Sequence, residues 1–560
     1  MYQTITKQEK SDLQVTCYKL HTHTYLEGAK TTSNFRENIK EGYMPLEKDI
    51  TYEGLFYDYS FDLRSEEDKA GTAEEVCKVN ELFCPYYVEA IEPEAKSIYL
   101  AVGLNSGIQE SEFQRRKLNL VVVLDISGSM NSFFNSYYYD ANRNSGNTGK
   151  SKIEGAKSAV IGLLKHIRLN EDRFGMVLFD SNSRVYRPLE MIKSAQEMQQ
   201  LQTRIMEDIT IGGSTNMESG FMKAIALFEG IRGQLHPSFD NRIIFVTDAM
   251  PNTGMINGNT LADMMKRYSQ HDEEHTRIRV YTTFIGVGVD MNSDLIEQIS
   301  KMQGCNYYSI HGYDDFVRKF DNDFLQLNST SSSSLSQSHV ASLDIVDVYG
   351  SPNANASSNG NLMFVHTLFP LLKIKPLKKS KVRFFCNKNI YIYVYNVYVL
   401  YNKPSFFCGV ILLQLRTNKN QNDTDTPFQE ISLVSSYKDR DDREYSSQKQ
   451  VHLRWKSQDR YYANLGIRKA VLLTKYVQTV KQWIKQERSH LANNDVNTWE
   501  RQSTSLQVSE TSKIFLLQMK QLFEQEMQVI GDSKLQQELD ILNFLVDYEP
   551  KNNSSSFSIF

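Results

Sequence analysis

One stretch, Leu118–Met130 (L-N-L-V-V-V-L-D-I-S-G-S-M), limits what this chain can fold into more than any other. Its first seven residues are apolar except for one asparagine, and three of them are valine. Such a run is typical of a strand that is covered on both faces of a parallel sheet. The run ends in Asp125, and Ser127 and Ser129 follow at alternating positions. Because open α/β sheets bind ligands at the carboxyl ends of their strands, this stretch predicts a ligand site.

Short apolar strands and amphipathic helices alternate after this stretch. Strands are expected at Phe174–Asp180, Arg242–Asp248, Val280–Val287 and Tyr307–Ile310. Helices are expected at Ile153–Ile167, Lys193–Met206, Asn216–Glu229, Leu261–Tyr268, Ser293–Lys301 and Asp314–Leu325. This order predicts an α/β fold, a doubly wound, Rossmann-like and mostly parallel sheet with helices on both faces.

The length of 560 residues is too great for one core, so two or three domains are expected. The sequence divides into an N-terminal region with part of a β-rich module (1–117), the α/β domain (118–325), a Ser-rich flexible linker (326–338), the rest of the β-rich module (339–456) and a helical C-terminal region (457–560). We expect the flanking module to be built from both sides of the α/β domain.

Several segments support this division. Residues 1–50 lack periodicity and are expected to be loosely ordered. Flanking strands are expected at 49–63, 95–103, 341–348, 363–368, 410–415 and 431–435. Helices are expected at Ile467–Ile484, Ile514–Phe523 and Leu535–Leu545. The apolar stripe of Ile467–Ile484 could dock a partner, but such a stripe is more often core, and we favour the core interpretation.

The segment Val382–Phe407 has an unusual composition. It contains no Asp, Glu, Gly or Ala, and it is rich in Tyr, Phe, Asn, Lys and Ile, whose codons are AT-rich. An unspliced intron that has been translated would give this composition, and so would a genuine buried strand pair. Sequencing of the transcript decides between the two.

Two further loops are expected to place oxygen ligands at the same edge of the sheet as the turn that follows Asp125. In Ile211–Met217 (I-G-G-S-T-N-M), Thr215 precedes a helix, and in Ile243–Asn252 a buried strand ends in Asp248. In a parallel sheet, Asp125 and Asp248 emerge at the same edge. Carboxylate and hydroxyl oxygens suit Mg²⁺, Mn²⁺ or Ca²⁺ and not zinc.

The motifs D-I-S-G-S, G-S-T and T-D, in this order, resemble the von Willebrand factor A (VWA) domain and its metal-ion-dependent adhesion site. The resemblance covers about 118–325, and the flanking segments are more loosely similar to bacterial-type and inter-alpha-trypsin-inhibitor-heavy-chain-like members. It implies a metal-ligand set, direct or through water, of Asp125, Ser127, Ser129, Thr215 and Asp248. One departure is Ala249, because the family usually has Gly after this Asp.

The resemblance also implies a function. Two carboxylates match the charge of Mg²⁺, which prefers six oxygens and keeps some waters, so an acidic side chain from a partner can replace one water. We therefore expect a divalent-metal-dependent protein-binding module, for adhesion or scaffolding, whose partner is a protein with an exposed Asp or Glu. Two alternatives are an intracellular subunit that assembles a complex with an ATPase, and a metal that only orders the loops.

The segment between Met130 and Lys152 contains aromatic residues close to the expected site, namely Phe133, Phe134 and Tyr137–Tyr139. They could anchor a partner and set partner choice, since aromatic side chains dominate interfaces. They could equally be tucked onto the domain within an Asn/Gly/Ser-rich loop.

Other classes of function find little support. A net charge of −4 gives no basic field for nucleic acid. The sequence has neither a G-x-S-x-G elbow nor a phosphate-binding loop, and G-V-G-V-D-M at Gly286–Met291 lacks the third glycine of a dinucleotide fingerprint. We therefore expect no enzyme. Without a signal peptide or a transmembrane stretch, a cytoplasmic protein is expected.

Overall fold

The computed structural model describes residues 32–63, 84–92, 97–105, 116–138, 151–236, 238–255, 257–269, 278–291, 295, 306–311, 331–337, 343–350, 361–368, 410–417, 428–438, 444–454, 460–489 and 503–549. The expected helices Ser293–Lys301 (apart from Leu295) and Asp314–Leu325, and the unusual segment Val382–Phe407, lie outside the described residues.

A six-stranded sheet forms the centre of the α/β domain, with the strand order β5-β4-β3-β6-β7-β8. Its strands are β3 (Lys117–Asp125), β4 (Arg173–Phe179), β5 (Ser183–Met191), β6 (Phe239–Thr247), β7 (Tyr281–Val287) and β8 (Asn306–Ile310). Neighbouring strands are parallel except for β5, which pairs with β4 in the antiparallel direction at the edge. The predicted doubly wound, mostly parallel sheet is confirmed, and β5 is the strand that the sequence pattern missed.

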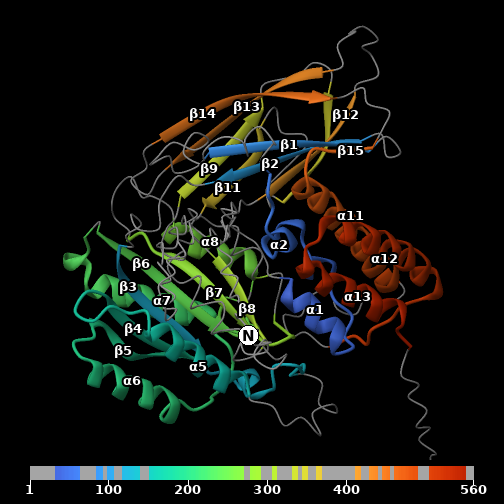
Figure 1. The fold of residues 1–560 in the computed structure, drawn as a ribbon. Coiled ribbons are helices and arrows are strands. Elements are labelled where there is room, and N and C mark those ends of the chain that lie inside the picture. Colours follow the sequence, from blue (N-terminus) through green and yellow to red (C-terminus); the bar gives the residue numbers. More distant parts are fainter. Residues whose placement is uncertain are drawn as a thin grey trace, which may run out of the picture.

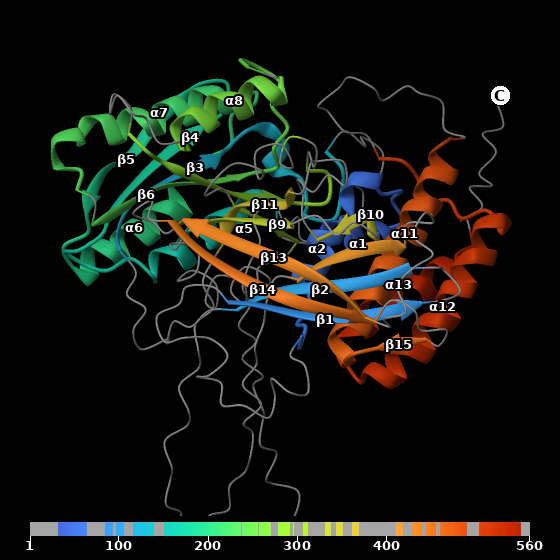
Figure 2. The same ribbon diagram turned by 90° about the horizontal axis from the view of Figure 1, so that it is seen from above.

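Helices cover both faces of this sheet (Figure 2). They are α5 (Lys152–Leu164) and α6 (Ala195–Glu207) on one face, and α7 (Met217–Gly230) and α8 (Gly258–Ser269) on the other. The side chains of β3 alternate between two separate cores, because successive residues of a strand point to opposite faces. Leu120, Val122 and Leu124 pack with α5, whereas Val121 and Val123 pack with α7. This is why the strand is apolar from Leu118 to Leu124 at every position except Asn119.

The flanking module contains two antiparallel sheets. The first has the order β10-β12-β2-β1-β15, from β1 (Cys84–Glu92), β2 (Ser97–Asn105), β10 (Leu343–Tyr349), β12 (Val410–Thr417) and β15 (Tyr461–Tyr462). The second has the order β11-β9-β13-β14, from β9 (Ser331–Gln337), β11 (Asn361–Leu368), β13 (Phe428–Lys438) and β14 (Glu444–Arg454). Strands from before and after the α/β domain therefore share one sheet, as expected.

The linker prediction is wrong for Ser331–Gln337, because β9 pairs with both β11 and β13. Serine content predicts a loop only by correlation, and two neighbouring strands satisfy the backbone of β9 on both sides.

Helices from both ends of the described chain form a third unit (Figure 1). It contains α1 (Ser33–Lys40), α2 (Tyr52–Tyr57), α11 (Leu465–Ser489), α12 (Glu510–Ile530) and α13 (Gln536–Val546). Residues of α11 share one core with α12, α13 and the sheet of β1 and β2, so the core interpretation of its apolar stripe is confirmed. Among the described helices, none is long and apolar enough to cross a membrane.

Two predictions for the N-terminal region are wrong. The weak periodicity of residues 1–50 pointed to loose order; of these, only 32–50 are described, and there α1 is a helix with Phe35 and Ile39 fully buried. The strand expected within 49–63 is instead helix α2, since the Thr51 side chain accepts a hydrogen bond from the Gly54 amide and caps the helix. Both helices are too short to show a clear period.

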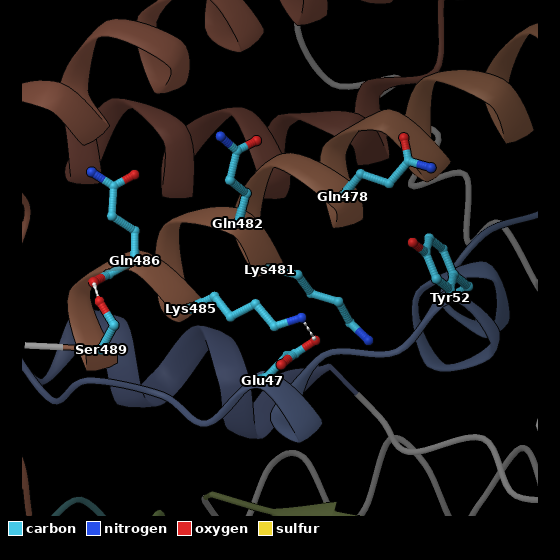
Figure 3. A pocket seen from close by; sticks show the side chains of 8 residues that line it. All are labelled: Glu47, Tyr52, Gln478, Lys481, Gln482, Lys485, Gln486 and Ser489. Carbon is cyan, nitrogen blue, oxygen red and sulfur yellow. Dashed lines mark hydrogen bonds and ion pairs between the residues drawn. The ribbon is translucent and has the colours of Figure 1, made fainter. Parts of the chain in front are cut away.

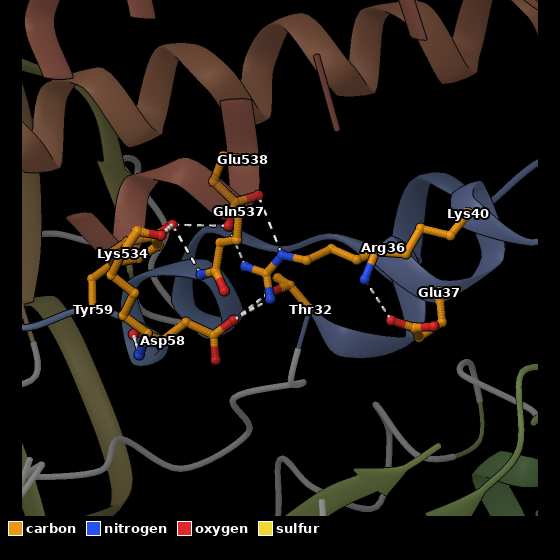
Figure 4. A network of polar contacts seen from close by, with 9 residues as sticks. All are labelled: Thr32, Arg36, Glu37, Lys40, Asp58, Tyr59, Lys534, Gln537 and Glu538. Carbon is orange, nitrogen blue, oxygen red and sulfur yellow. Dashed lines mark hydrogen bonds and ion pairs between the residues drawn. The ribbon is translucent and has the colours of Figure 1, made fainter. Parts of the chain in front are cut away.

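A buried ion pair ties the N-terminal helix to the C-terminal one (Figure 4). The Arg36 guanidinium contacts the Glu538 carboxylate, whose side chain is fully buried, and also Asp58 at 2.7 Å. The Tyr59 hydroxyl donates to Glu538 at 2.9 Å. Because a buried carboxylate without such partners would be costly, this network fixes α1 against α13.

Helix α1 also reaches the α/β domain. The Tyr137 hydroxyl donates to Asn38 Oδ1 at 2.7 Å, and Asn38 Nδ2 donates to the Val289 carbonyl at 3.1 Å. The Tyr43 and Tyr137 rings are 4.7 Å apart between centroids, edge to face. The helical unit therefore contacts two loops at the carboxyl edge of the central sheet.

Candidate metal centre

The two aspartates of the predicted site lie side by side at one edge of the sheet. Strands β3 and β6 are parallel neighbours with Leu124 opposite Val246, so Asp125 lies next to the end of β6. Asp248 is the first residue after β6. The Thr247 hydroxyl donates to Asp125 Oδ2 at 2.6 Å. Both aspartates are fully buried.

The two serines lie in the turn that follows β3. The Ser127 amide donates to Asp125 Oδ1 at 2.9 Å, and Ser127 Oγ lies 3.2 Å from Ser129 Oγ. Ser129 lies in a short 3₁₀ helix, Gly128–Asn131, which directly follows Ser127. One carboxylate and two hydroxyls therefore converge within one turn.

The third predicted loop is joined to the other two by backbone hydrogen bonds. The Gly212 amide donates to the Ile126 carbonyl at 2.7 Å, and the Gly128 amide donates to the Gly213 carbonyl at 3.0 Å. The carbonyl of the buried Thr215 accepts from the Asn252 amide, in the loop after β6, at 3.1 Å. The structure thus brings all three predicted loops to one edge of the sheet.

Burial makes the two carboxylates costly to ionise. Desolvation, reinforced by the nearby Asp248 carboxylate, raises the pKa of Asp125 to about 7. Desolvation also raises the pKa of Asp248, although Lys152 and the Ser129 hydroxyl act in the opposite direction. A cation placed between the two would remove this penalty, since opposite charge favours the ionised form.

The donors fit a hard divalent cation. Asp248 Oδ1 is buried and receives no hydrogen bond from the described residues, so its lone pairs are available to coordinate a cation in a solvent-excluded site. Among the described residues, no group of three or more His, Cys, Asp and Glu side chains could hold a metal. Any metal site here therefore depends on two carboxylates and neutral hydroxyl oxygens, the ligands that suit Mg²⁺ or Mn²⁺.

Two charged residues at this edge were missed by the sequence analysis. The Lys152 ammonium is fully buried, 2.6 Å from Asp290 Oδ1 and 3.2 Å from Asp248 Oδ2. Burial lowers the pKa of Lys152, but Asp290 and Asp248 outweigh burial and raise it. Two signals could have revealed them. Lys152 lies in the first turn of α5, where the helix dipole disfavours a cation, and Asp290 lies in the loop that follows β7.

The departure at Ala249 has a structural consequence. Its φ is +56°, the left-handed region in which glycine is at ease and alanine is strained. Its side chain is fully buried in the core beside α7. The loop after Asp248 therefore keeps a glycine-like conformation without a glycine.

The aromatic residues after Met130 differ in their exposure, and their role as partner anchors stays a prediction. Phe134 and Tyr137 are buried, so these two are tucked onto the protein. Tyr138 is 39% exposed, and its hydroxyl lies beside Gly128 in the turn of the two serines. Tyr139 lies outside the described residues.

A groove on the helical unit offers no comparable chemistry (Figure 3). It has a volume of about 660 Å³ and is lined by Glu47, Tyr52, Gln478, Lys481, Gln482, Lys485, Gln486 and Ser489. The Lys485 side chain is 74% exposed, and its ion pair with Glu47 is long, at 3.7 Å. These are solvated side chains of an open surface, so the carboxyl edge of the sheet remains the candidate site.

A mostly parallel sheet whose carboxyl edge gathers D-x-S-x-S, Thr and Asp defines a domain of the VWA class. The family model described as von Willebrand factor type A domain matches residues 120–250, so this chain contains a VWA domain. Domains of this family generally mediate protein interactions, are generally not enzymes, and often bind a divalent metal. A comparison with curated proteins gives no match.

Solved structures with a similar fold include several VWA proteins. A von Willebrand factor type A protein from Catenulispora acidiphila is 10% identical, with 77% of this chain and 94% of that chain covered and a TM-score of 0.42. The ArnB paralog VWA2 from Sulfolobus acidocaldarius is 12% identical, with 80% and 92% covered and a TM-score of 0.35. Proximal thread matrix protein 1 from the mussel byssus, with a zinc-occupied metal-ion-dependent adhesion site, is 14% identical, with 40% and 47% covered and a TM-score of 0.26.

Proposed function

We propose that the VWA domain binds Mg²⁺, or Mn²⁺ or Ca²⁺ in its place, and uses the ion to bind a protein partner. The ligands would be Asp125, Ser127, Ser129, Thr215 and Asp248, directly or through water. The observation that carries the proposal is the buried, unpartnered Oδ1 of Asp248 at the same sheet edge as a second buried carboxylate. A cation between them would stabilise the ionised form of both carboxylates.

The electrostatics favour a partner carboxylate as the completing ligand. The two ligand carboxylates only balance the charge of the ion, and the hydroxyls add none. Mg²⁺ prefers six oxygens and keeps several waters, so an Asp or Glu side chain of the partner can displace one of them. The exposed ring of Tyr138, beside the turn of the serines, offers the partner an apolar contact at the rim.

Calorimetry of the full chain with MgCl₂ and with MnCl₂ tests the metal. Heat of binding is expected for the wild type and its loss for Asp125→Asn and Asp248→Asn. Asp180→Asn is the matched control, since Asp180 follows β4 at the same edge and its Oδ1 already accepts from the Asn182 amide. A wild type that binds neither ion, or a control that loses binding as the other two do, would overturn the proposal.

Affinity purification with magnesium and with EDTA tests the partner. A protein that is retained only with magnesium, and whose binding is lost when its exposed acidic residue is changed to an amide, is the expected result. Tyr138→Ala should weaken this capture and leave the magnesium affinity unchanged. If capture is indifferent to EDTA, the metal only orders the loops; if the captured protein is an ATPase, the chain belongs to the complex-assembly class.

A further inference from the structure

A buried lysine lies next to the proposed metal ligands and has its own carboxylate. The Lys152 ammonium is 2.6 Å from Asp290 Oδ1 and 3.2 Å from Asp248 Oδ2, and all three side chains are fully buried. The shorter contact is with Asp290, which is not a member of the ligand set. Lys152 therefore lies between the two carboxylates, with a hydrogen bond to Asp248 Oδ2 and a shorter ion-pair contact with Asp290 Oδ1.

The fold provides a specific place for this lysine. Gly288 has a φ of +91°, and a Cβ added there would lie 2.5 Å from Lys152 Cε, so only glycine leaves room for the lysine stem. Asp290 is fixed as well, because its Oδ2 accepts from the Tyr138 amide at 3.1 Å. Ser151 caps α5 through a capping box with Glu154, which fixes where Lys152 starts the helix.

The Lys152–Asp290 pair is neutral overall, so it leaves the charge of the two ligand carboxylates unchanged. When ionised, the three carboxylates of Asp125, Asp248 and Asp290 and the one ammonium of Lys152 leave a net charge of −2. A divalent cation brings that charge to zero. Without Asp290, the lysine would have only Asp248 to neutralise, and it would compete with the ion for that ligand.

We infer that Asp290 is a positioning residue that shares the Lys152 ammonium with Asp248 and so limits its hold on that ligand, and that the neutral Lys152–Asp290 pair leaves the metal site with a net charge that suits a divalent ion. This inference rests on the proposed function, because it concerns the affinity of that same site. Neither residue needs to touch the ion. The two residues act on the ion electrostatically, and the interaction is strong because the charges are buried and only a few ångströms apart.

The magnesium dissociation constant of three variants tests the inference by the sign of each change. Asp290→Asn should weaken binding by about tenfold or more, because the ammonium then pairs with Asp248 alone and its uncompensated charge repels the ion. Lys152→Met should tighten binding by about tenfold, because a competing cation is removed. The double variant should bind at least as tightly as the wild type, because both charges are gone.

This pattern separates charge balance from simple damage to the structure. Damage would weaken binding in every variant, and would be worst in the double variant. Lys157→Met is the matched control, since Lys157 is a largely buried lysine of the same helix whose ammonium donates to the Ile209 carbonyl at 2.6 Å, away from the ligands. It should leave magnesium affinity unchanged.

Calorimetry with MgCl₂, supported by spectroscopy of bound Mn²⁺, gives the readout for the full chain. If Lys152→Met alone fails to fold, Asp290→Asn and the double variant still decide, because the double variant carries no unpaired charge. A double variant as weak as Asp290→Asn overturns the inference while the wild type still binds. A wild type that binds no metal instead overturns the proposed function, so the two failures are distinguishable.

Discussion

Raising the pH should destabilise the metal-free VWA domain, and magnesium should cancel the effect. The pKa of Asp125 is raised from 3.8 to about 7, mainly by burial. Between these two values the folded protein holds a proton that the unfolded chain has lost. Stability from this group is therefore greatest at low pH and falls as the pH rises toward the folded-state pKa.

The size of the effect follows from the shift. Each pH unit between these two pKa values lowers the free energy of unfolding by about 1.4 kcal/mol for one such carboxyl group. From pH 5 to pH 7 the free energy of opening should therefore fall by about 2 kcal/mol, because the folded carboxyl is half ionised at pH 7, and it should level off above about pH 8. Saturating magnesium restores a similar amount, since a ligand at about 100 times its Kd stabilises by about 2.7 kcal/mol.

Hydrogen exchange of the β3 and β6 peptides measures this free energy locally, after correction for the intrinsic pH dependence of exchange. Local measurement is needed because a chain of several domains does not unfold in one step. Asp125→Asn should reduce the pH trend, leaving only the contribution of Asp248, and should abolish the magnesium effect, whereas Asp180→Asn should keep both. A trend of the same slope in Asp125→Asn, or none in the wild type under EDTA, would refute the assignment of the shift to Asp125.

Two further perturbations test the packing around the site and in the helical unit. Arg36→Met should cost about 3–5 kcal/mol, because it leaves the buried Glu538 carboxylate without its cation. Urea unfolding followed by the buried tryptophan of α11 measures this, and a double variant with Glu538→Leu should recover most of the loss; a loss below about 1 kcal/mol, as for an exposed pair, would contradict burial. Gly155→Ala should cost about 1–3 kcal/mol, because the added methyl would lie 2.1 Å from the Phe134 ring. Thermal unfolding compares it with Gly230→Ala, whose methyl meets nothing within 4 Å; equal stability of the two would argue against the tight contact.

The α/β domain could be predicted because its sequence patterns are local. Strand β3 is buried on both faces, and an apolar run of its length is typical of such a strand. The turn residues that follow it contain the site motif. Once the sheet is parallel, the meeting of Asp125 and Asp248 follows from chain direction alone. Edge strand β5 was missed because half-exposed strands such as Ser183–Met191 lack a continuous apolar run.

The remaining errors concern structure that depends on distant partners. Strand β9 is rich in serine and is a strand only because β11 and β13 lie beside it. Helix α1 is short and is held by Glu538, a residue of the last helix. Lys152 escaped notice for the same reason, because the aspartate that holds it follows a strand more than a hundred residues further along. Contacts between residues so far apart in the sequence leave no periodic pattern in the local sequence.

The shared sheet of the flanking module has a consequence for synthesis on the ribosome. Strand β2 ends at Asn105, but β12, which covers its free edge, begins at Val410, about 300 residues later. At about 5–20 residues per second, the edge of β2 in the nascent hairpin stays open for about 15–60 seconds. Exposed strand edges promote aggregation, so during this interval the growing chain should need a chaperone, while the VWA domain, whose strands all emerge earlier, can already fold.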